Sequence, residues 1–128
     1  MASSSAGLHE SPDDLGPATI DRHRAIVSVM EELEAVDWYD QRVAAASDAE
    51  LAAILAHNRD EEKEHAAMLL EWLRRRDPAL DEQLRTYLFS DGPILATEAA
   101  AEADGAGDGG DDEDGGGGLT IGSLRDLG

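Results

Sequence analysis

A glutamate and a histidine interrupt an apolar stripe that otherwise runs through residues 51–73. Glu62 and His65 recur at helical spacing with large apolar side chains, namely Leu51, Ile54, Leu55, Leu69, Trp72 and Leu73. A helix in a folded protein buries such a stripe, and a buried charge is costly unless it is paired or binds a metal ion. The segment is therefore predicted to be an amphipathic helix whose buried face must satisfy two polar side chains.

The spacing of Glu62 and His65 suits a metal site. Residues i and i+3 share a helix face with their Cβ atoms about 5–6 Å apart, so that a carboxylate oxygen and an imidazole nitrogen can bind one ion. Glu-x-x-His is also the half-motif of carboxylate-bridged di-iron bundles, in which two further helices each add a lone glutamate. A solvated or interface-paired histidine is the alternative interpretation.

The preceding helix offers one candidate for the lone glutamate. Its apolar positions form a wide stripe at helical spacing, made by Ile26, Val29, Met30, Leu33, Val36 and Val43. At about 100° per residue, Glu32 lies on the shoulder of this stripe next to Tyr39. The opposite face carries Glu31, Glu34 and Trp38. Glu32 is therefore predicted to face the core, and a plain charged surface made by the three glutamates is the alternative.

One lone glutamate and one Glu-x-x-His pair make half of a di-iron site. Two identical chains related by a two-fold axis would complete the site, and this is the commonest oligomeric symmetry. The four carboxylates would then balance the charge of two divalent ions. The predicted fold class is all-α, with two long antiparallel helices, a short third helix and a four-helix bundle completed by dimerisation.

Helix-start and helix-stop residues set the expected boundaries. Ser47 and Glu50 fit a capping box that opens the second helix, and Asp77 is placed to cap the third. The helices are predicted to span about 17–46, 47–76 and 78–89. This gives a mobile arm over residues 1–16 and a helical domain over residues 17–95.

Composition excludes several classes of site and partner. The chain has no cysteine, so disulfides and thiolate metal sites are ruled out and oxygen and imidazole ligands remain. Its 29 acidic side chains outnumber 10 basic ones, which argues against binding nucleic acid. There is no apolar run long enough for a membrane span and no secretory signal, so a cytoplasmic protein is expected.

The C-terminal part changes composition twice. Residues 96–118 hold eight acidic and no basic side chains among alanine and glycine, which predicts a disordered, flexible linker. Apolar side chains return in residues 119–128, with Leu119, Ile121 and Leu124. A short apolar peptide on a polar tether is typical of a docking motif, and a terminus of no consequence is the alternative.

Residues 22–34, 38–42 and 58–65 closely resemble the encapsulated ferritins. Residues 119–124 are similar to the cargo-loading peptide that docks such proteins inside encapsulin nanocompartments. The resemblance implies a ferritin-like bundle, a ring of five dimers and a ferroxidase centre at each dimer interface. The shell protein would be bound through Leu119–Leu127, and the location would be the compartment's interior.

The resemblance also implies roles for single residues. It makes Glu32, Glu62 and His65 iron ligands of the catalytic centre, with Tyr39 as a partner behind them. It further implies an uptake site, where iron enters, lined by Glu31, Glu34 and Trp38. Beside the apolar stripe of the second helix, a further acidic cluster is a candidate secondary cation site, unless it is an ordinary solvated face; its members are His57, Glu61 and Glu64.

The predicted function is oxidation of Fe(II) to Fe(III) with dioxygen, delivering iron for storage inside an encapsulin shell. Calcium, zinc or manganese are alternative occupants of the central or uptake site. Two other functions stay open at this stage. One is a non-catalytic helical assembly held together by metal ions, and the other is a cargo adaptor whose main task lies in its docking peptide.

Overall fold

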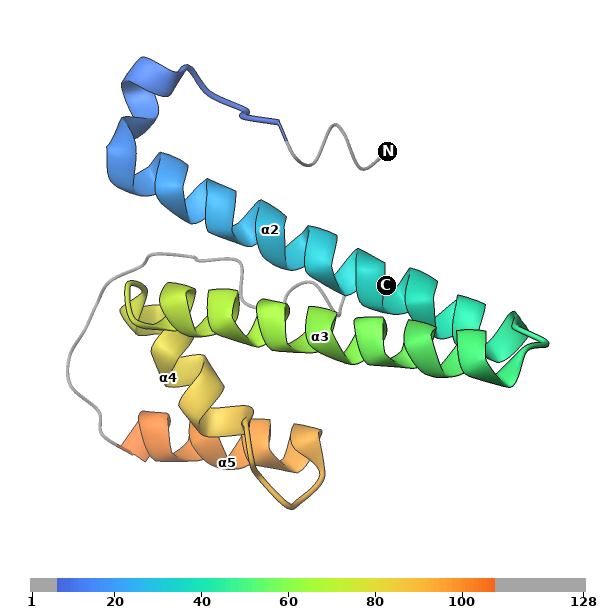
Figure 1. Ribbon diagram of the computed structural model, residues 1–128. Coiled ribbons are helices and arrows are strands. Elements are labelled where there is room, and N and C mark those ends of the chain that lie inside the picture. Colours follow the sequence, from blue (N-terminus) through green and yellow to red (C-terminus); the bar gives the residue numbers. More distant parts are fainter. Residues whose placement is uncertain (1–6, 108–128) are drawn as a thin grey trace. The chain divides into compact units, whose positions relative to one another are not determined.

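The computed structural model describes residues 7–107, and these are all-α, as predicted (Figure 1). They fall into two compact units, one ending at Arg85 and the other beginning at Thr86. No helix within the described residues combines the length and the apolar character needed to cross a membrane. The helices are α2 (Pro12–Ala45), α3 (Ala49–Arg74), α4 (Pro78–Tyr87) and α5 (Ile94–Gly107).

Helices α2 and α3 form an antiparallel hairpin, which confirms the two long helices predicted (Figure 1). Small side chains lie between them, since Ala25 of α2 and Ala66 of α3 are buried together with Leu73. An ion pair from Arg59 Nη1 to Asp40 Oδ1, 2.8 Å long, joins the helices near the turn. The hairpin therefore holds α2 and α3 close enough for side chains of one helix to reach those of the other.

One helix cap lies at the residue predicted from the sequence, and another lies one residue away from its predicted position. Asp77 Oδ1 accepts a hydrogen bond from the Leu80 backbone N–H at 3.0 Å, as predicted for the start of α4. The cap of α3 is Asp48, whose Oδ1 accepts from Leu51 N–H at 2.8 Å, so the predicted capping box at Ser47 is wrong by one residue. Serine and aspartate are about equally good caps, which leaves the sequence unable to choose between neighbours.

The start of α2 differs from the predicted mobile arm. A helical turn begins at Pro12, with Asp13 and Asp14 in its first turn, where proline and acidic side chains are favourable. A kink at Gly16, with φ 77° and ψ 161°, separates this turn from the regular helix that starts at Pro17. That backbone conformation is essentially restricted to glycine. Residues 1–6 of the arm lie outside the described part.

Helix α5 corrects the prediction that disorder begins at residue 96. Its sequence is rich in alanine, the residue with the highest helix propensity, and this outweighs the low hydrophobicity and high acidic charge on which the disorder prediction rested. The backbone of Pro93 accepts hydrogen bonds from the N–H groups of Ala96 and Thr97, both at 3.1 Å, at the first turn. The remainder of the predicted linker and the predicted docking peptide, residues 108–128, lie outside the described residues.

The hairpin leaves much of its apolar surface uncovered. Three apolar residues are buried among those described, whereas both long helices carry exposed large apolar side chains; these are Ile26, Met30, Leu33, Trp38, Leu51, Ile54 and Met68. Exposed apolar surface of this extent is typical of a surface that contacts another chain. Two helices alone provide too little core to cover it.

Candidate metal centre

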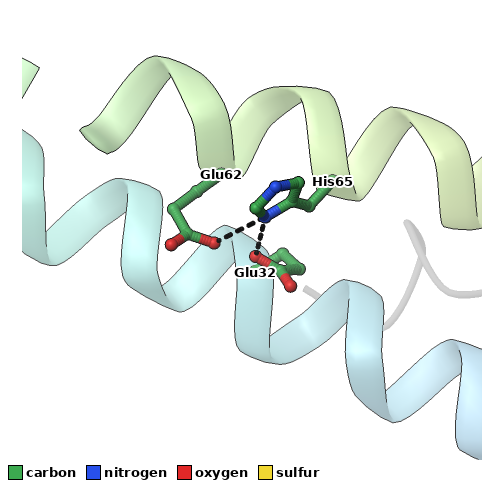
Figure 2. A group of neighbouring side chains, drawn as sticks. All are labelled: Glu32, Glu62 and His65. Carbon is green, nitrogen blue, oxygen red and sulfur yellow. Dashed lines mark hydrogen bonds and ion pairs between the residues drawn. The ribbon is translucent and has the colours of Figure 1, made fainter. Parts of the chain in front are cut away.

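Glu32, Glu62 and His65 converge between α2 and α3 (Figure 2). His65 Nδ1 lies 3.4 Å from Glu62 Oε2 and 3.5 Å from Glu32 Oε2. The three ligand atoms all lie within 4.8 Å of one another, the one such group of metal-ligating side chains found in residues 7–107. The structure thus brings together the three residues that helical periodicity selected.

The hairpin explains why these side chains meet. Glu62 and His65 are one helical turn apart on α3 and share a face. Glu32 extends from α2 toward them (Figure 2). Ala66, which follows His65, and Ala25, two turns before Glu32, are both buried, and their small size lets the helices approach closely.

The donor set fits a divalent transition-metal ion. Carboxylate oxygen and imidazole nitrogen suit Fe²⁺, Mn²⁺ and Zn²⁺. Such ligands bind at about 2.0–2.2 Å, and two neighbouring ligands on one ion then lie about 3.0–3.5 Å apart. The separations of 3.4 and 3.5 Å from His65 to the two glutamates match that range. Three ligands leave further coordination positions for other groups.

The three side chains shift one another's pKa values. Hydrogen bonding to Glu62 raises the pKa of Glu32, and burial and the negative charge of Glu62 act in the same direction. Hydrogen bonding to Glu32 and to His65 lowers the pKa of Glu62. Burial would lower the pKa of His65, but hydrogen bonding to Glu62 and the charges of both carboxylates raise it. The raised pKa values of Glu32 and His65 favour proton binding at these two groups, and a bound cation would compete with those protons.

The centre is open to one side in the single chain. The His65 side chain is 43% exposed, and those of Glu32 and Glu62 are each 25% exposed. Beside His65 lies a shallow cavity of about 590 Å³. Its lining joins both helices and consists of Asp21, Arg24, Ala25, Ser28, His65, Met68, Leu69 and Trp72. Neither Ser28 nor Met68 was predicted from the sequence as a site residue. Ser28 lies one helical turn before Glu32, and Met68 lies one helical turn after His65.

The other residues predicted for the centre and for the uptake site all lie on α2. The ring of Tyr39 lies under the Arg42 guanidinium, 5.5 Å from its centroid. Of the predicted uptake site, Glu31 and Glu34 are exposed, and Trp38 lines a separate small cavity with Gln41 and Arg42. Neither Glu31 nor Glu34 belongs to the group of converging ligands.

The predicted secondary cation site is only partly assembled. His57 Nε2 pairs with Glu61 Oε1 at 2.9 Å, and both side chains are more than half exposed. Glu64 is exposed on the same helix. No group of three ligand atoms forms there among the described side chains, so this patch stays a proposal.

Comparisons with known proteins agree on one family. A family model described as EncFtn-like matches residues 7–91. An encapsulated ferritin-like protein of Rhodospirillum rubrum is 65% identical over 98% of this chain and 92% of its own length. A ferritin-like protein of Thermotoga maritima is 52% identical over 80% of this chain and 90% of its own.

Two further matches bear on fold and context. A crystal structure of a protein from Nitrosomonas europaea is 65% identical, with a TM-score of 0.67, and the match covers 69% of this chain and 97% of that one. An encapsulin nanocompartment cargo protein of Myxococcus xanthus is 38% identical over 41% of this chain and 40% of its own.

Proposed function

The chain belongs to the EncFtn-like family, and on that basis we propose that it is a ferroxidase whose di-iron centre is shared between two chains. The observation that carries the proposal is the convergence of Glu32, Glu62 and His65 from two helices. Fe²⁺ is the substrate: two ions each give up one electron to dioxygen and become Fe³⁺. The catalytic residues are the ones that hold the iron.

Dimerisation is proposed because one chain lacks half of the ligands. A di-iron bundle uses four glutamates and two histidines, and the hairpin supplies half of them. The centre is also partly exposed, and the two helices that hold it carry uncovered apolar side chains such as Leu33 and Ile54. A second hairpin packed against the exposed side of the centre would complete the ligand set. The same interface would cover apolar surface of the two helices. A ring of five such dimers is the proposed larger assembly.

Each ligand has a distinct proposed task. Glu62, which has the lower pKa of the two carboxyl groups, is charged first and is proposed to bridge the two ions. Glu32 is proposed as a terminal ligand, and His65 supplies the nitrogen. Fe²⁺ would compete with protons for Glu32 and His65, whose pKa values are raised, because metal ligands bind in their deprotonated forms. Tyr39 is proposed as a partner behind the ligands, and Glu31, Glu34 and Trp38 as the uptake site.

Packaging inside an encapsulin shell is the second part of the proposal. Relatives of this chain carry the names encapsulated ferritin-like protein and encapsulin nanocompartment cargo protein. The apolar residues of 119–127 are proposed to dock on the shell, and the enzyme would supply oxidised iron for storage there. The location of the protein would then be the interior of the compartment.

The test is stopped-flow oxidation of Fe²⁺ by the purified protein, followed by the absorbance of Fe³⁺ and by oxygen consumption. Loss of a residue that only hydrogen-bonds to a metal ligand typically lowers activity roughly 10–100-fold. Each single ligand substitution should reduce the oxidation rate by more than this; the variants are Glu32→Ala, Glu62→Ala and His65→Ala. His23→Ala removes a histidine outside every candidate site and should retain the wild-type rate. Tight cation binding without iron oxidation would instead indicate a non-catalytic assembly held by metal ions.

A further inference from the structure

Met68 follows the two ligands of α3 along the chain. It is the third residue after His65, as His65 is the third after Glu62, so its side chain lies one helical turn beyond the His65 imidazole. Met68 and His65 line the same cavity of about 590 Å³, together with the apolar side chains of Leu69 and Trp72. Met68 is 57% exposed in the single chain, so its side chain is not enclosed by the hairpin itself.

We propose that Met68 is a site of sulfoxide formation fed by the metal centre. The inference rests on the proposed ferroxidase function. When two Fe²⁺ ions reduce one dioxygen molecule by two electrons, two protons are taken up and hydrogen peroxide is the product. The Met68 sulfur then gives an electron pair to one peroxide oxygen, the O–O bond breaks, and the other oxygen leaves as water. Thioethers are readily oxidised in this way, and the reaction is reversible by reductases.

Met30 provides a control within the same chain. It is the other methionine among residues 7–107 and is 42% exposed, so peroxide in bulk solution can reach it as well. Met30 precedes Glu32 by two residues, which places it about 160° away around α2. It does not line the cavity that contains His65. Peroxide from solution should therefore oxidise both methionines, whereas peroxide made at the centre reaches Met68 first.

The experiment compares two sources of peroxide on the full-length protein. One sample receives hydrogen peroxide without iron, and the other is taken through repeated additions of Fe²⁺ in air while Fe³⁺ is recorded. Peptide mass spectrometry then gives the ratio of sulfoxide at Met68 to that at Met30. Iron turnover should raise this ratio about threefold or more above its value with added peroxide. Met68→Leu should lose the sulfoxide while keeping the rate of iron oxidation.

The outcomes separate the inference from the function on which it rests. Iron oxidation with a ratio no higher than that given by added peroxide would overturn the role of Met68 and leave the ferroxidase proposal in place. Absence of iron oxidation would refute the ferroxidase proposal itself. A raised ratio that persists with catalase in solution would support direct transfer from the centre to Met68.

Discussion

Cation binding should raise the thermal stability of the protein by an amount that depends on His65. Few side chains are buried in the hairpin, so ligands that join α2 to α3 should contribute a large share of its stability. A redox-inert ion such as Co²⁺ at about 100 times its Kd contributes about 2.7 kcal/mol. For a domain of this size each kcal/mol moves Tm by about 4–8 °C, so the expected rise is about 10–20 °C.

The variant His65→Ala removes one of the three donors. If binding weakens about 100-fold, the same Co²⁺ concentration contributes only about 0.4 kcal/mol, and the shift in Tm falls to about 2–3 °C. Melting is followed by circular dichroism at fixed protein concentration, with and without a chelator. His23→Ala is the matched control and should keep the full shift even if its own Tm is lower. A full shift in His65→Ala would refute the assignment of this residue as a ligand.

Three further outcomes are expected. Because the pKa values of Glu32 and His65 are raised, protons compete with the cation, and calorimetric affinity for Mn²⁺ should increase from about pH 6 to 8, less steeply in His65→Ala. Hydrogen bonds from Arg74 and Arg75 lower the pKa of Glu71 to about 2, so its stabilising effect is present above about pH 4.5 and is lost as pH falls toward 2. Glu71→Gln should therefore show a shallower fall in Tm over that range, and an unchanged slope would contradict this. Deleting residues 119–128 should abolish co-purification with an encapsulin shell but leave iron oxidation intact, and full loading of the truncated protein would show that docking depends on another segment.

The metal centre could be predicted because its geometry is mostly local. Glu62 and His65 lie one turn apart on a single helix. Among the neighbouring glutamates of α2, helical periodicity predicts that Glu32 faces the partner helix. Periodicity could not show Met68 beside the centre, since an apolar residue at that spacing is ordinary in a buried stripe. The cavity that Met68 shares with His65 becomes visible only when both helices are in place.

The incorrect boundaries have different physical causes. Ser47 and Asp48 are nearly equivalent caps, and only the backbone geometry selects Asp48. The kink at Gly16 depends on a positive φ that a glycine permits but does not require. In α5, local alanine propensity and high acidic charge favour opposite states, and the prediction gave too much weight to the charge.

The most direct test of the shared centre is a crystal structure of the iron-loaded protein with anomalous diffraction measured at the iron edge. We expect pairs of iron peaks at a two-fold axis between chains, about 2.0–2.2 Å from the ligand atoms of Glu32, Glu62 and His65. Both chains should contribute ligands to each pair. Iron held by the residues of one chain alone, or bound only at other positions, would contradict the account.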